Sequence, residues 1–153
     1  MKKLMHLTTA LSFILFLFSC SSSTADMNPS LPAPETEINP VGTLAVIKEG
    51  MLMPQSGTNT KGMIEIVSDE EENYFLRLGN DFLSDFHTGT VTVYLSTSNQ
   101  LNLSASESFQ LVGVVNDAGE HFFNLSKLPE SKFSDGIIWC GAAGIPFGYG
   151  SFE

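Results

Sequence analysis

The chain has few basic residues and few cysteines. It contains 7 lysines and arginines against 17 aspartates and glutamates, for a formal net charge of -10. Nucleic acid is therefore not expected as a partner, because binding it depends on basic patches that neutralise phosphates. The 2 cysteines are too few for a disulfide scaffold, or for a zinc site by themselves.

Common catalytic motifs are also missing. The sequence has no phosphate-binding glycine loop, no Gly-x-Ser-x-Gly turn and no Cys-x-x-Cys pair. No motif therefore argues for a stand-alone enzyme, although a redox module stays possible. The length of 153 residues predicts a single folded domain.

The first 19 residues have the form of a secretory signal peptide. Lys2 and Lys3 precede a mostly apolar stretch, Leu4–Leu17, which is shorter than the about 20 residues that a transmembrane helix needs. The run Leu17-Phe18-Ser19-Cys20 follows and resembles the lipobox of bacterial lipoproteins. Cleavage before Cys20 and lipidation of its thiol would anchor the protein in the bacterial cell envelope, with the outer membrane favoured. The alternative is an ordinary signal peptide, which leaves Cys20 as a thiol.

Residues 20–40 are expected to be a tether that begins at the lipidated cysteine. Four of the chain's 7 prolines lie here among serine, threonine and glutamate. Such a segment buries too little apolar surface to offset its ordering entropy, and its prolines favour extended conformations. At about 3.1 Å per residue it could reach up to roughly 60 Å. Membrane lipid, through acylated Cys20, is thus the first expected partner, and residues 41–153 are the expected folded domain.

The hydrophobic pattern of that domain is typical of β structure and has no sustained helical period. Short apolar runs separated by turn-like residues predict an antiparallel β-sandwich or barrel-like fold of about 8–9 short strands. Val91 and Val93 alternate with threonines, which is typical of a strand with one wet face. The expected strands are Gly42–Glu49, Gly62–Ser68, Tyr74–Leu78, Asp81–Phe86, Val91–Ser96, Phe109–Asn116, Glu120–Leu125, Gly136–Cys140 and Pro146–Phe152.

An ordered set of short blocks covers nearly the whole domain. The blocks are Leu76–Leu78, Asp81-Phe82, Thr90–Ser96, Leu111–Gly113, Gly119–Leu125, Phe133–Gly136, Ile137–Cys140 and Phe147-Gly148. In this order they resemble the DM-thirteen domain family, which occurs in animal and plant proteins, often beside DOMON domains, and in bacteria. The resemblance implies an all-β domain with a characteristic cysteine, for which an electron-transfer role has been proposed. That cysteine corresponds to Cys140.

The chain departs from the family pattern at three places. Members often carry a histidine before the Ser-Gly that opens an early strand, where this chain has Thr58–Gly62. The usual Gly-Pro before the Tyr-Leu-Ser strand is Gly89-Thr90, and an aromatic soon after the cysteine is replaced by Ala143. If the missing histidine is a cofactor ligand, a redox role loses that ligand here.

Cys140 supports two hypotheses of function. In the first it is the candidate redox residue, accessible to an envelope redox protein beside the small residues Gly141–Gly144, where a ligand or another backbone could approach closely. In the second it is a buried core residue of a non-catalytic binding or scaffold module. Ligand contacts would then come from loops such as Gly50–Gly62 or Leu101–Ser108.

The histidines offer possible ligand partners for Cys140. His87 is expected at a turn and His121 in a strand, and either could join Cys140 at a metal or haem if the fold brought them together. Their spacing matches no metal motif, so no metal site is assigned and the cofactor is left unknown. The acidic run Asp69–Glu72 lacks the pattern of a calcium loop and is expected to be a solvated hairpin tip.

Trp139 and Cys140 are consecutive on an expected strand, so they should face opposite sides of a sheet. The size of the indole predicts that Trp139, with Ile137, fills the sandwich interior, and that Cys140, with Ile138, faces the other way. The residues assigned a structural role are Trp139, Gly141, Gly144, Phe147 and Gly148.

Overall fold

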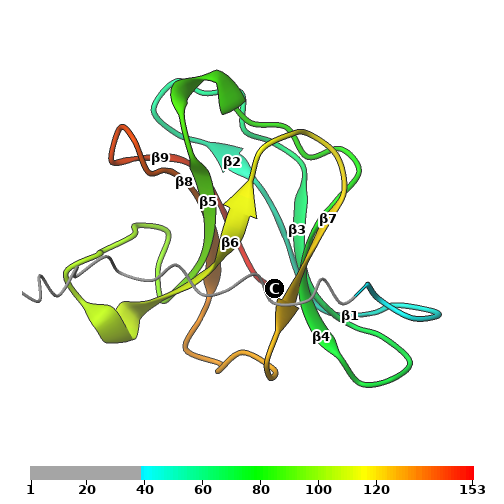
Figure 1. Cartoon of the computed structure of the whole chain (residues 1–153). Helices are drawn as coiled ribbons and strands as arrows, with labels where there is room; N and C mark the ends of the chain where they lie inside the picture. The colour runs from blue at the N-terminus through cyan, green and yellow to red at the C-terminus, as the bar shows by residue number, and fades with distance from the viewer. Residues whose placement is uncertain (1–38) are drawn as a thin grey trace, which may run out of the picture. The chain divides into compact units, whose positions relative to one another are not determined.

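The computed structural model describes residues 39–153, which form a β-sandwich of two antiparallel sheets (Figure 1). This confirms the predicted fold class. The strands are β1 (Ala45–Met51), β2 (Met53–Pro54), β3 (Met63–Ser68), β4 (Tyr74–Leu78), β5 (Val91–Ser96), β6 (Phe109–Val115), β7 (His121–Leu125), β8 (Asp135–Cys140) and β9 (Ile145–Ser151), with two short 3-10 helices, η1 (Phe86–Thr88) and η2 (Ser106–Ser108). The signal peptide 1–19, Cys20 and the tether up to residue 38 lie outside the described residues.

The two sheets have the strand orders β1-β3-β4-β7 and β2-β9-β8-β5-β6. The same stretch of chain supplies an edge strand to each sheet, because β1 and β2 are separated only by Leu52. The side chain of Leu52 is 2% exposed and belongs to the core. Pro54 ends β2 at the edge of its sheet, where a residue without an N–H does not interrupt a ladder.

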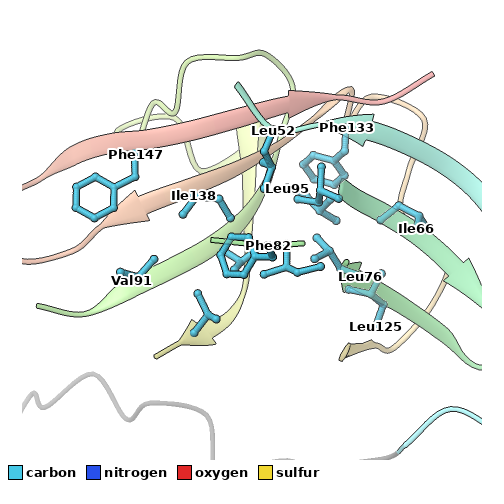
Figure 2. Packing of buried hydrophobic residues seen from close by; sticks show 14 of the residues in the cluster. Leu52, Ile66, Leu76, Phe82, Val91, Leu95, Leu125, Phe133, Ile138 and Phe147 are labelled. Atoms are coloured by element: carbon cyan, nitrogen blue, oxygen red, sulfur yellow. The ribbon is translucent and has the colours of Figure 1, made fainter. Parts of the chain in front are cut away.

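The hydrophobic core lies between the sheets (Figure 2). From the five-stranded sheet, Val91, Val93 and Leu95 of β5 enter the core, and Thr92 between them points to the other face. The four-stranded sheet contributes alternate residues of β3 and β4, among them Ile66 and Leu76. The wet face predicted for this strand from the valine–threonine alternation is wrong, because Thr92 is buried on the outer face, where its hydroxyl donates to the carbonyl of Trp139.

Eight of the nine predicted strands have a counterpart among the observed ones, with ends that differ by a few residues. The exception is Asp81–Phe86. There only Leu83 pairs, in an isolated bridge with Lys61, while Phe82 is 1% exposed in the core and Phe86 begins η1. The aromatic side chains of this segment pack into the core between the sheets, and its backbone does not extend a sheet. Strand β2 was missed because two residues, one of them a proline, carry no period.

The acidic run forms the tip of the β3–β4 hairpin, and three of its four side chains are exposed. Asp69 is the buried one, and it organises the turn. Its carboxylate accepts hydrogen bonds from the side-chain amide of Asn73 (3.0 Å), from the backbone N–H of Asn73 (2.8 Å) and from the backbone N–H of Glu71 (3.0 Å). These bonds, above all the one from the Asn73 side chain, hold the pKa of Asp69 below its ordinary value.

The outer face of the four-stranded sheet carries charge. Arg77 of β4 lies between two carboxylates, at 3.0 Å from Glu65 and 2.6 Å from Glu120, and its guanidinium lies over the ring of Phe122 at 5.8 Å from the centroid. This face therefore combines an ion-paired cluster at Arg77 with the fully buried side chains of Val67 and Phe75.

Candidate functional site

Cys140 is the last residue of β8 and is 0% exposed. It belongs to the hydrophobic core cluster together with Val91, which pairs with it on β5, and with Phe147 of the next strand. The backbone N–H of Ala143 donates to its Sγ at 3.4 Å. The thiol is therefore enclosed by the sandwich and by the turn that follows it.

That turn is the stretch of small residues Gly141–Gly144, which connects β8 to β9. The N–H of Gly141 donates to the carbonyl of Thr90 at 2.8 Å, and the N–H of Gly144 donates to the carbonyl of Cys140 at 2.9 Å. A Cβ built on Gly89 would lie 2.7 Å from the Cβ of Ala142. The close approach that the small residues permit is thus made by the chain's own Gly89-Thr90 segment.

The remaining structural residues lie on β9. Phe147 is buried in the core. Gly148 sits where β9 meets β2, and a Cβ there would lie 2.6 Å from Cγ2 of Thr60 and 2.9 Å from the carbonyl oxygen of Met53. Glycine at this position lets the edge strand approach.

The two histidines have separate environments. His87 is exposed in η1. His121 of β7 stacks on Phe123, meets Phe82 edge to face, and its Nε2 lies 3.0 Å from the carbonyl oxygen of Asp117. Within residues 39–153 no group of three or more His, Cys, Asp or Glu side chains is placed to hold a metal ion. Cys140, His87 and His121 do not form such a set.

Trp139 faces the opposite way from the prediction. Ile138 and Cys140 are the core residues of this part of β8, whereas Trp139 is half-buried on the outer face with Ile137. The expected alternation is correct, but the assignment of its two faces is wrong. Size misled the prediction, because at this end the interior holds the small thiol while Phe147 supplies the aromatic volume.

The outward turn of Trp139 makes it part of an apolar surface on the five-stranded sheet. Register places residues of all five strands side by side in one row, because Tyr94 pairs with both Leu111 and Ile137, and Tyr149 pairs with both Ile137 and Met53. Trp139 stands next to this row, two residues along β8 from Ile137. We call the six residues Met53, Tyr94, Leu111, Ile137, Trp139 and Tyr149 the aromatic platform.

The platform is accessible at its margins and closed at its centre. Met53 is 51% exposed and Leu111 44% exposed, the three aromatic side chains are half-buried, and Ile137 between the two tyrosines is 0% exposed. Sequence reasoning missed this surface because its residues come from five separate segments. The one available clue was that Tyr94, Trp139 and Tyr149 each lie in a predicted strand.

The hydroxyl groups of the two loops predicted to contact a ligand are hydrogen-bonded within the protein. In Gly50–Gly62, Thr58 donates to the carbonyl of Phe147 (2.6 Å), and the hydroxyls of Thr60 and Ser84 lie 2.9 Å apart. Leu101–Ser108 ends in η2, and the hydroxyl of Ser108 donates to the carbonyl of Ala105 at 2.7 Å. In Gly50–Gly62 the side-chain oxygen of Gln55 is buried without a hydrogen-bond partner, and it is the only such side-chain atom among residues 39–153.

Comparisons with protein-family models, with curated proteins and with solved structures gave no match. The resemblance to the DM-thirteen family therefore stays a prediction from the sequence. Among residues 39–153, no helix is long and apolar enough to cross a membrane.

Proposed function

We propose that this protein is a lipid-anchored module of the bacterial cell envelope that binds a ligand without chemically transforming it, and in which Cys140 is a core residue. The burial of Cys140 carries the proposal. A redox or ligating cysteine reacts as its thiolate and has to meet its partner, whereas this side chain is 0% exposed among apolar neighbours. Free cysteine of this kind packs as a small hydrophobic residue.

The electron-transfer role implied by the family resemblance is the competing hypothesis. It requires Cys140 to become accessible or to ligate a cofactor. The environment of His121, between two phenylalanine rings and against Asp117, is that of a packed histidine and supports the core role instead. The exposed apolar surface on the other side of β8 supports binding as the activity.

The anchor in this proposal rests on the sequence. The lipobox residues Leu17–Cys20 directly follow the apolar core of the signal peptide, and a proline-rich tether separates Cys20 from the domain. The chain enters the domain beside the β3–β4 turn, where the N–H of Val41 donates to Asp69 at 3.1 Å and the N–H of Thr43 donates to Glu70 at 3.0 Å. A domain held in this way on a tether of about 20 residues would search for its ligand near the membrane surface.

The first prediction of the proposal is a silent native thiol. Ellman titration of the folded protein is expected to detect no reaction at Cys140, and full reaction after denaturation, because reagent cannot reach a side chain with 0% exposure. An absorption spectrum of the same sample is expected to show no visible band. A native thiol that reacts at once, or a haem or metal band, would reject the core role and favour electron transfer.

The second prediction concerns the anchor. Intact mass spectrometry of the protein purified from bacterial membranes is expected to give a chain that begins at Cys20 and carries diacylglycerol. Cys20→Ala is expected to abolish this modification and to leave the protein uncleaved or released, with the fold unchanged. A mature chain with an unmodified Cys20 would contradict lipid anchoring without touching the binding role.

A further inference from the structure

We propose that the aromatic platform binds a neutral β-linked polysaccharide, with the sugar rings lying on its aromatic side chains. This inference rests on the proposed function and names the chemical class of its ligand. Three observations carry it: the arrangement of the rings, the polar groups that they present and the near absence of charge on the sheet.

The rings are spaced for a linear chain of sugars. Tyr94 and Tyr149 lie in one row on either side of Ile137, two strands apart, which is about 10 Å at the usual strand spacing. The repeat of a β-linked disaccharide is comparable in length. Trp139 lies beside the row on the strand between them. A row of aromatic side chains held on neighbouring strands offers apolar area to the C–H faces of alternate sugar rings at little conformational cost.

The same side chains carry unused hydrogen-bonding groups. Neither the hydroxyls of Tyr94 and Tyr149 nor the indole N–H of Trp139 has a hydrogen-bond partner among residues 39–153, and none of the three is a buried unsatisfied atom. By contrast, the hydroxyl of Thr92 on this face is already engaged, donating to the carbonyl of Trp139 at 3.2 Å. Ligand hydroxyls could therefore pair with groups at the rims of the rings while the sugar faces stack on them.

The sheet is nearly uncharged although the chain carries a formal net charge of -10. Its five strands contain one charged residue, Asp135. That carboxylate is buried and accepts hydrogen bonds from the hydroxyls of Ser134 (2.7 Å) and Ser151 (2.6 Å). Charges instead lie on the other sheet, around Arg77. A neutral, hydroxyl-rich ligand matches this face, whereas nucleic acid would be repelled by the acidic chain.

The test uses the single tryptophan as its probe. Because Trp139 is the only tryptophan in the chain, its fluorescence reports on the platform alone. Titration of the full chain with cellohexaose, chitohexaose and laminarihexaose is expected to give a saturable change with at least one of them. Tyr149→Ala is expected to weaken that binding about tenfold. Leu128→Ala, which removes a 44% exposed apolar side chain outside the platform, is the matched control and is expected to bind like the parent.

Two outcomes would overturn the proposal. One is the lack of any saturable change at millimolar oligosaccharide with all three probes. The other is self-association through the platform, seen as a concentration-dependent dimer in sedimentation that Tyr149→Ala dissociates. Thermal melts of both variants check that they are folded. Neither outcome touches the lipid anchor, which is tested at Cys20, or the core role of Cys140, which fails if the native thiol is reactive or ligates a cofactor.

Discussion

Ile138→Ala is expected to lower the free energy of unfolding by about 2–5 kcal/mol, more than Trp139→Ala at the next position. Ile138 is a core residue between the sheets, and its removal leaves a cavity beside Val93, the core residue of β5 that pairs with it. Trp139 is half-buried on the outer face, so its removal is expected to cost about 1–2 kcal/mol. This order is the reverse of what the sizes of the two side chains suggest.

Denaturant unfolding followed by circular dichroism measures both changes, because the tryptophan fluorescence is lost in one variant. Leu128→Ala serves again as the control and is expected to stay within about 0.5 kcal/mol of the parent. A larger loss for Trp139→Ala than for Ile138→Ala would restore the face assignment made from the sequence and remove the aromatic platform.

The sequence predicted the strands well because their signals are local. Tyr74–Leu78 and Val91–Ser96 were predicted to the residue, since each is a short run rich in aromatic and aliphatic residues between turns. The pairing of strands across the two sheets was not predictable in this way. It depends on contacts between segments far apart in the chain, as in the row that runs from Leu111 to Met53.

Alternation showed which residues of β8 share a face, but not which of the two faces points into the core. The sequence shows that Ile137 and Trp139 share one face and that Ile138 and Cys140 share the other. Both isoleucines are fully buried, so hydrophobicity does not distinguish the faces. What decides is the facing sheet, whose core residues meet Ile138 in the interior. The burial of Cys140 and the position of Trp139 in the platform both follow from which face of β8 points into the core.

The strand predicted over residues 81–86 was wrong for a different reason. Its apolar residues follow the turn at Gly79, where the N–H of Phe82 donates to the carbonyl of Gly79 at 2.9 Å. Phe82 then enters the core and meets Phe86 and His121 edge to face. The segment therefore buries an aromatic side chain without pairing as a strand. Strand propensity alone does not distinguish such a core-packing loop from a short strand.

Cys140→Ser is expected to destabilise the domain by about 1–3 kcal/mol, because it places a hydroxyl where the thiol packs in an apolar cluster. The serine oxygen would inherit the hydrogen bond from the N–H of Ala143, which now reaches Sγ at 3.4 Å. The shorter C–O bond also loosens the contacts that sulfur makes in the cluster. The loss is therefore expected to appear as a lower melting temperature.

Cys140→Ala is the matched control for this substitution, because it shortens the side chain without adding a polar group. If Cys140 is a core residue, both variants melt below the parent, the serine variant bears the added cost of its hydroxyl, and both keep the parent's binding at the platform, since Trp139 points away from the substituted side chain. If Cys140 is instead a redox centre, the serine variant keeps its melting temperature and loses electron exchange. A serine variant as stable as the parent would therefore contradict the core role directly, whatever the platform binds.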